Sequence, residues 1–109
     1  MMKVENMKEV RVVVFVRLWK ADDRFIARAE RPGSELLMKY VGSKAVARIS
    51  GLNVEFRTAI TQWNRGTVVL TLPAALNPTW ERLWRRNERL IVELTIEENE
   101  ETKAVGEAA

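Results

Sequence analysis

Apolar and polar residues alternate along several short segments of the chain, a pattern typical of β-strands that bury one face. Residues 10–19 read VRVVVFVRLW, which combines β-branched and aromatic residues with two arginines, Arg11 and Arg17, on one face. Residues 24–30 alternate in the same way, and Asp22 and Asp23 before them can form a turn. The two segments together predict a β-hairpin.

A break in the alternation follows this hairpin. Residues 31–34 contain Pro and Gly, and residues 35–41 predict a short helix with Ser34 as its N-cap. Gly42 ends the helix, and residues 44–49 alternate again as a third strand. The first half therefore predicts a hairpin, a short helix and a strand.

The second half of the chain repeats this order of elements. It predicts a strand, a turn, a returning strand, a short helix and a closing strand at residues 54–63, 64–66, 67–72, 78–86 and 89–96. Asn77 is the expected cap of the helix and Pro78 suits its first position. Asn87 suits a left-handed residue at the end of the helix.

The two halves can be aligned with each other. Residues 15–19 match residues 59–63 at an offset of 44 positions, and residues 45–49 correspond roughly to residues 92–96. Repeats would then span residues 10–50 and 54–96. Few residues are identical, so a chance similarity of element order is the alternative to an internal duplication.

Length and composition indicate one globular unit. A chain of 109 residues fits a single domain, which we expect at residues 1–96. The content of 47% apolar and 30% charged residues is that of a folded protein with a heavily charged surface. Short strands with two short helices predict an α+β fold that is mainly β.

The chain contains no Cys and no His. Their absence excludes disulfides and thiolate zinc sites, and it removes the usual ligands of transition metals and the usual catalytic nucleophiles and bases. Asp22 and Asp23 are ordinary turn residues, with a divalent-cation site as the alternative. We expect a binding protein with no cofactor, no metal and no catalytic residues.

No segment is apolar enough for a membrane. The longest uninterrupted apolar run covers residues 12–16, whereas a membrane-spanning helix needs about 20 residues. No apolar signal segment follows the N-terminus. We therefore expect no membrane partner and a cytoplasmic location.

Basic and acidic residues are separated along the chain. Residues 8–96 hold 16 Lys and Arg against 9 Asp and Glu, and residues 97–109 hold five Glu against one Lys. This predicts a disordered acidic tail at residues 97–109 and a basic body that favours polyanions such as nucleic acid. The alternative is a surface of solvated ion pairs as in proteins of thermophiles, which the excess of Arg over Lys would suit.

One stretch carries a resemblance to a known family. Residues 56–76 read FRTAITQWNRGTVVLTLPAAL, which is a strand ending in Trp, a tight turn, and an apolar strand ending in Leu-Pro. With the helix and strand that follow, about 40 residues resemble the AbrB/MazE (SpoVT-AbrB) family of swapped-hairpin DNA-binding proteins. Asn64 and Asn87 stand where the family usually has Gly, and the first 50 residues have no counterpart in its short members.

The resemblance implies a swapped-hairpin-like β-barrel that binds duplex DNA, as a transcription regulator or as the DNA-binding half of an antitoxin. Family members dimerise by exchanging hairpins, so a homodimer, or a pseudo-dimer formed by a duplicated chain, is implied. A toxin partner is not favoured, because a tail of 13 residues is short for binding one. The residues implied in DNA binding lie on the two hairpins: Arg57, Asn64, Arg65, Arg17, Lys20 and Arg24.

The four tryptophans leave other functions open. Trp80 and Trp84 share a helical face that we expect to pack in the core, and a secondary basic surface would comprise Arg82, Arg85, Arg86 and Arg89. Trp19 and Trp63 lie beside turns and are the candidates for exposure. Exposed Trp with interleaved Arg is typical of proteins that bind single-stranded nucleic acid. A structural or protein-interaction module, of viral or mobile-element origin, is the remaining alternative.

Overall fold

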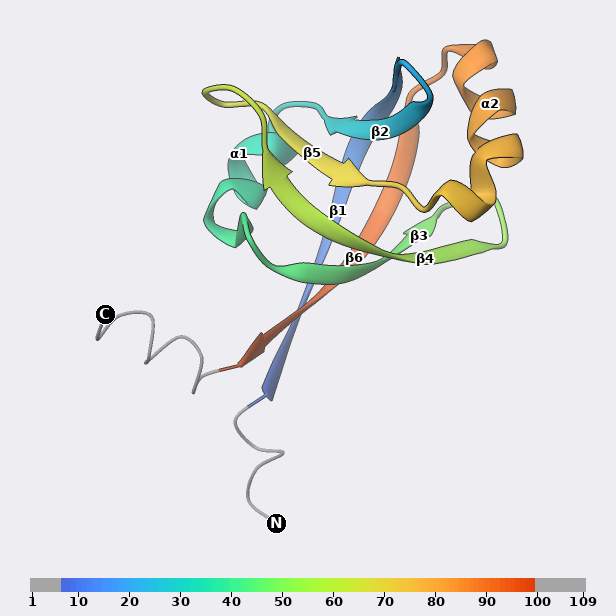
Figure 1. Cartoon of the computed structure of the whole chain (residues 1–109). Helices are drawn as coiled ribbons and strands as arrows, with labels where there is room; N and C mark the ends of the chain where they lie inside the picture. The colour runs from blue at the N-terminus through green and yellow to red at the C-terminus, as the bar shows by residue number, and fades with distance from the viewer. Residues whose placement is uncertain (1–6, 100–109) are drawn as a thin grey trace.

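Six antiparallel strands close into a barrel in the computed structural model, which describes residues 7–99. The strands are β1 (Met7–Ala21), β2 (Arg24–Ala29), β3 (Lys44–Ile49), β4 (Val54–Gln62), β5 (Val68–Thr71) and β6 (Leu90–Asn99). Two short helices, α1 (Gly33–Leu37) and α2 (Asn77–Arg86), lie on opposite sides of the barrel (Figure 1). The predicted fold class, α+β and mainly β with two short helices, is confirmed.

The strands follow one another around the barrel in the order β1-β2-β5-β4-β3-β6, and β6 pairs again with β1. The two predicted hairpins, β1-β2 and β4-β5, are therefore neighbours through the pairing of β2 with β5. Figure 1 shows β1 and β6 continuing beyond the rest of the barrel as a two-stranded ribbon.

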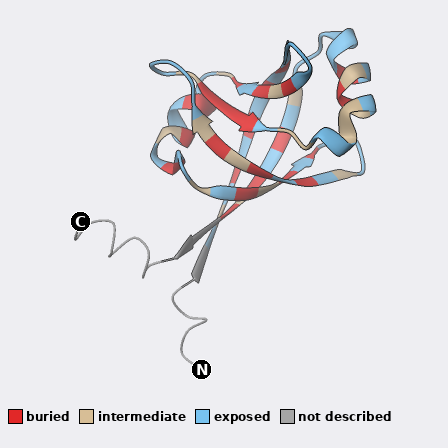
Figure 2. Ribbon diagram, in the orientation of Figure 1, coloured by how far each residue is buried: buried red, intermediate tan, exposed pale blue. Residues whose placement is uncertain are grey.

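The inner faces of the strands make the core. Along β1, the buried side chains of Val12, Val14 and Val16 alternate with exposed ones, as the red and pale blue segments of Figure 2 show. Each such apolar side chain contributes about 1.5–3 kcal/mol when it is removed from water. The alternation along the sequence is thus the alternation between the inside and the outside of the barrel.

The strand order stays the same when the first three strands are exchanged with the last three. The register agrees with this exchange. Val14 of β1 pairs with Val92 of β6, and Thr58 of β4 pairs with Ala45 of β3. Thr58 is 44 positions after Val14, and Ala45 is 47 positions before Val92. The same offsets align the two halves of the sequence. The barrel has an approximate internal two-fold symmetry, which is in keeping with a duplication.

Helix α1 begins earlier than predicted. Its N-cap position is Pro32, and Ser34 lies buried inside the helix without a side-chain hydrogen bond to its end, so the prediction of Ser34 as N-cap is wrong. Gly33 packs directly on Val14, which fixes the start of the helix against β1. A 3-10 turn, Met38–Tyr40, completes the segment that was expected to be helical.

The C-terminal end of helix α2 agrees with the prediction. Asn87 has a φ of 53° and ends the helix in the left-handed conformation, as expected. At the other end, a 3-10 turn, Ala74–Leu76, leads directly into the helix, so Asn77 is its first residue rather than its cap. The indole of Trp80 is fully buried, and its Nε1–H donates to the carbonyl oxygen of Pro73 at 2.9 Å.

Strand β6 extends to Asn99, three residues beyond the predicted end of the domain at residue 96. The three added residues continue the ladder with β1, in which Asn99 pairs with Met7. The rest of the predicted acidic tail, residues 100–109, lies outside the described residues.

Candidate functional site

The tips of the two hairpins lie at opposite ends of the β2-β5 pair, because these strands are antiparallel. The tip of the first hairpin lies beside the start of α2, where Lys20 Nζ is 3.5 Å from Glu81 Oε1. The tip of the second hairpin, with Arg65, lies beside the segment that leads into α1. The residues predicted to bind DNA therefore do not form a single surface.

A depression of about 580 Å³ lies between the outer face of the first hairpin and the tip of the second. We call it the hairpin groove and define it by Arg17, Trp19, Arg28, Glu30, Arg31 and Arg65. It brings together Arg17 and Arg65, one predicted residue from each hairpin. Arg28 and Arg31 were not predicted, although Arg28 is the direct cross-strand partner of Arg17 and follows from the two-residue turn at Asp22 and Asp23.

Four arginines and one glutamate give the hairpin groove a net positive charge. Glu30 compensates the close pair of Arg17 and Arg28 only in part, since its carboxylate binds Arg17 Nε at 2.9 Å and also Arg89 Nε at 2.9 Å. The guanidinium of Arg28 lies 5.7 Å from the ring centre of Trp19. Like charges directly opposite each other destabilise a strand pair unless a counter-charge is near. An anion in the groove would supply that charge.

Lys20 fastens α2 to the first hairpin. Its ammonium group lies 5.1 Å from the ring centre of Trp84 and 5.5 Å from that of Phe25, in addition to the ion pair with Glu81. Removal from water would raise the pKa of the Glu81 carboxyl, but the hydrogen bond from Arg85 and the charge of Lys20 outweigh it, and the pKa lies below its ordinary value. Lys20 would have to give up these structural contacts in order to bind DNA.

The other predicted residues are dispersed. Arg24 is exposed beside the tip of the first hairpin, and Arg57 lies on β4 opposite Val46, outside the hairpin groove. Asn64 shapes the tip of the second hairpin, because its carbonyl oxygen accepts hydrogen bonds from Thr67 N at 3.2 Å and Gln62 Nε2 at 3.3 Å.

The secondary basic surface is partly neutralised. Arg85 Nε pairs with Glu81 at 2.8 Å, and Arg89 pairs with Glu30 and lies 4.8 Å from the ring centre of Phe15. Arg82 and Arg86 are exposed on α2. This surface therefore presents two arginines outside the ion pairs of the described residues.

Within residues 7–99, no cluster of three or more acidic, His or Cys residues could hold a metal ion. In the same part of the chain, no helix has the length and apolar content to cross a membrane. No family model, curated protein or solved structure matches the chain.

Proposed function

We propose that the protein is a DNA-binding transcription regulator, not an enzyme, which binds the phosphate backbone of duplex DNA at the hairpin groove. The observation that carries the proposal is the convergence of Arg17, Arg28, Arg31 and Arg65 from two hairpins and an adjoining loop on one depression. The resemblance to the AbrB/MazE family supports the same function and remains part of the proposal. A cytoplasmic location follows from it.

Arginines suit this role because the guanidinium group can donate two parallel hydrogen bonds to a phosphate. Phosphate contacts would position the DNA, and base contacts would provide any sequence preference. Asn64 is exposed at the tip of the second hairpin beside Arg65, and its amide group would donate to or accept from a base edge. The half-exposed ring of Trp19 at the rim would add a stacking surface for an unpaired base.

The test is the affinity of the whole chain for duplex DNA, measured by fluorescence anisotropy at low salt. The double variant Arg28→Gln, Arg65→Gln should lose about tenfold in affinity for each arginine. The double variant Arg82→Gln, Arg86→Gln removes the same charge from α2 and serves as the matched control. Equal losses in both variants would contradict a role for the groove, and tighter binding of single-stranded than duplex DNA would favour the single-strand alternative.

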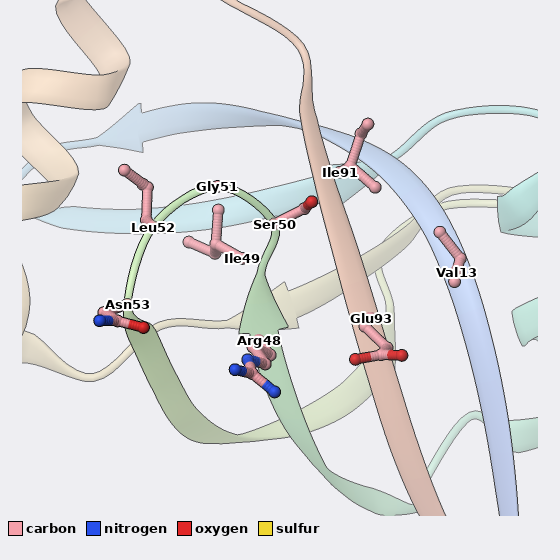
Figure 3. Close-up of a pocket in the computed structure, with 9 residues that line it drawn as sticks. All are labelled: Val13, Arg48, Ile49, Ser50, Gly51, Leu52, Asn53, Ile91 and Glu93. Atoms are coloured by element: carbon pink, nitrogen blue, oxygen red, sulfur yellow. The ribbon is translucent and has the colours of Figure 1, made fainter.

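An exposed apolar patch favours a second function, self-association. Val13, Phe15, Leu52 and Ile91 are between 37% and 60% exposed, and Phe15 and Ile91 are direct cross-strand partners. Figure 3 shows Val13, Ile91 and Leu52 around a depression of about 560 Å³, with Arg48 and Glu93 beside them on neighbouring strands. We expect a second copy of the chain here, because a patch that carries one charge of each sign is complementary to itself under two-fold symmetry.

A further inference from the structure

A third depression, of about 330 Å³, lies where β4 changes its pairing partner from β3 to β5. β4 pairs with β3 from Val54 to Ala59 and with β5 from Ile60 to Gln62 (Figure 1). We call the depression at this junction the threonine pocket and define it by Lys44, Val46, Arg57, Thr58, Thr71 and Thr95. It does not share a residue with the hairpin groove.

Side-chain hydrogen bonds replace the backbone ladder at this junction. The backbone N–H of Ala59 donates to Thr71 Oγ1 at 2.9 Å, and the hydroxyl of Thr58 donates to the carbonyl oxygen of Thr71 at 2.8 Å. The single hydroxyl proton of Thr58 is thereby used. The hydroxyl proton of Thr71 has only the distant Thr58 Oγ1, at 3.4 Å, as an acceptor among the described side chains. Since an O–H···O bond is usually about 2.5–3.0 Å long, Thr71 retains a donor for a ligand.

Among the residues whose side chains are described, the charged ones that line the threonine pocket are Lys44 and Arg57. Arg57 pairs with Val46, and Lys44 is two positions from Val46 on the same strand, so the two cations are diagonal neighbours on one outer face. Side chains in this relation lie about 7–8 Å apart at their bases, within reach of a common ligand. Neither cation forms an ion pair with another residue of the range 9–96.

The barrel itself does not require these two charges. Under the internal two-fold relation, Arg57 corresponds to Val13 and Lys44 to Ile91, both of which are apolar and partly exposed. The fold therefore tolerates uncharged residues at these places. Two adjacent positive charges repel each other, and a bound anion would offset this repulsion.

We propose that the threonine pocket is a second binding site, specific for a phosphate group, with Arg57, Lys44 and the Thr71 hydroxyl as its donors. The donors come from the three strands β3, β4 and β5, so they can donate to different oxygens of one phosphate group. The phosphate belongs either to a small phosphorylated molecule or to the backbone of a nucleic acid.

The experiment follows the backbone amides of the full chain by ¹H–¹⁵N NMR during a titration with inorganic phosphate at constant ionic strength. Saturable shifts of the Ala59 and Thr71 amides are expected, with chloride as the comparison anion. Arg57→Gln and Lys44→Gln should each weaken phosphate binding about tenfold. Arg82→Gln removes the same charge on α2, outside the pocket, and should leave phosphate binding unchanged. Shifts that do not saturate, or that are the same in Arg57→Gln, would overturn the proposal.

Two further measurements identify the source of the phosphate and test whether this site is independent of DNA binding at the hairpin groove. If Arg57→Gln also weakens duplex binding, the ligand is a nucleic-acid backbone; if it weakens phosphate binding alone, the ligand is a small phosphorylated molecule. Both results uphold the site. The groove variant Arg28→Gln, Arg65→Gln should keep its phosphate affinity, so a failure of DNA binding at the groove leaves the test of this pocket intact. Loss of phosphate binding in the groove variant would contradict a separate site.

Discussion

Gly33 lies so close to Val14 that a Cβ atom on Gly33 would come within 2.8 Å of Val14 Cγ1. We predict that Gly33→Ala destabilises the protein by about 1–3 kcal/mol, because the added methyl group must displace β1 or α1. Urea unfolding would measure the change. Val14→Gly removes both Val14 Cγ1 and Val14 Cβ, which would lie 2.8 and 2.9 Å from the added atom, so Gly33→Ala combined with Val14→Gly should be less destabilised than the two single variants together. Strictly additive losses would show that the contact is looser than described.

The DNA affinity should depend steeply on salt if the hairpin groove contacts phosphates. The slope of the logarithm of the binding constant against the logarithm of salt concentration reports the number of phosphates contacted. Replacing both Arg28 and Arg65 by Gln should reduce this slope by about 2, or about 1 for each lost phosphate contact. Anisotropy titrations at several salt concentrations would measure it. An unchanged slope in this variant would place the phosphate contacts elsewhere.

The attachment of α2 to the first hairpin should weaken in acid. The pKa of Glu81 is lowered in the folded protein by Arg85 and Lys20, against the opposing effect of partial removal from water. The ionised carboxylate therefore adds stability above the unfolded pKa, and this contribution disappears as the pH falls through the folded pKa. Denaturant unfolding of the wild type and Glu81→Gln should differ at neutral pH and converge in acid. A difference that is independent of pH would rule out the carboxylate as its cause.

Self-association should depend on the apolar patch. We predict that Val13→Glu, which places a charge at the most exposed apolar position of the patch, converts the homodimer to a monomer. Sedimentation equilibrium or light scattering after gel filtration would measure the mass. Val41→Glu changes another exposed apolar residue, outside the patch, and should leave the dimer intact. A wild-type chain that is monomeric at high concentration would contradict the second function.

Local pattern was sufficient to predict the strands and their turns. The strand Lys44–Ile49 was predicted with its observed bounds, and Asn87 takes the left-handed backbone expected of it. Ser34 shows where local pattern fails, because the packing of Gly33 on β1 sets the start of α1 and overrides the capping preference of the next residue. Tertiary contacts between distant segments are not encoded in a short window of sequence.

Some contacts of the hairpin groove follow from local sequence, and others depend on the pairing of distant strands. The pairing of Arg17 with Arg28 follows from the two-residue turn and could have been predicted from the sequence. The approach of Arg65 and Arg31 could not, because it depends on the pairing of β2 with β5, which joins segments some 40 positions apart. Arg57 was grouped with Arg65 because both lie on the predicted hairpin that carries the family resemblance, yet the two line different depressions.

The internal symmetry of the barrel has a consequence for how the chain folds. Only two ladders, β1-β2 and β4-β5, lie within one half, whereas β1-β6, β2-β5, β3-β4 and β3-β6 join the halves. Neither half can satisfy the backbone of its third strand by itself. β3 pairs with β4 and β6, which belong to the second half, and β6 pairs with β1 and β3, which belong to the first. Cleavage of the chain in the turn of residues 50–53 would yield two fragments, each unfolded by itself and folded only when the two are mixed. The repeated unit is thus a unit of sequence pattern, and the cooperative folding unit is the whole barrel.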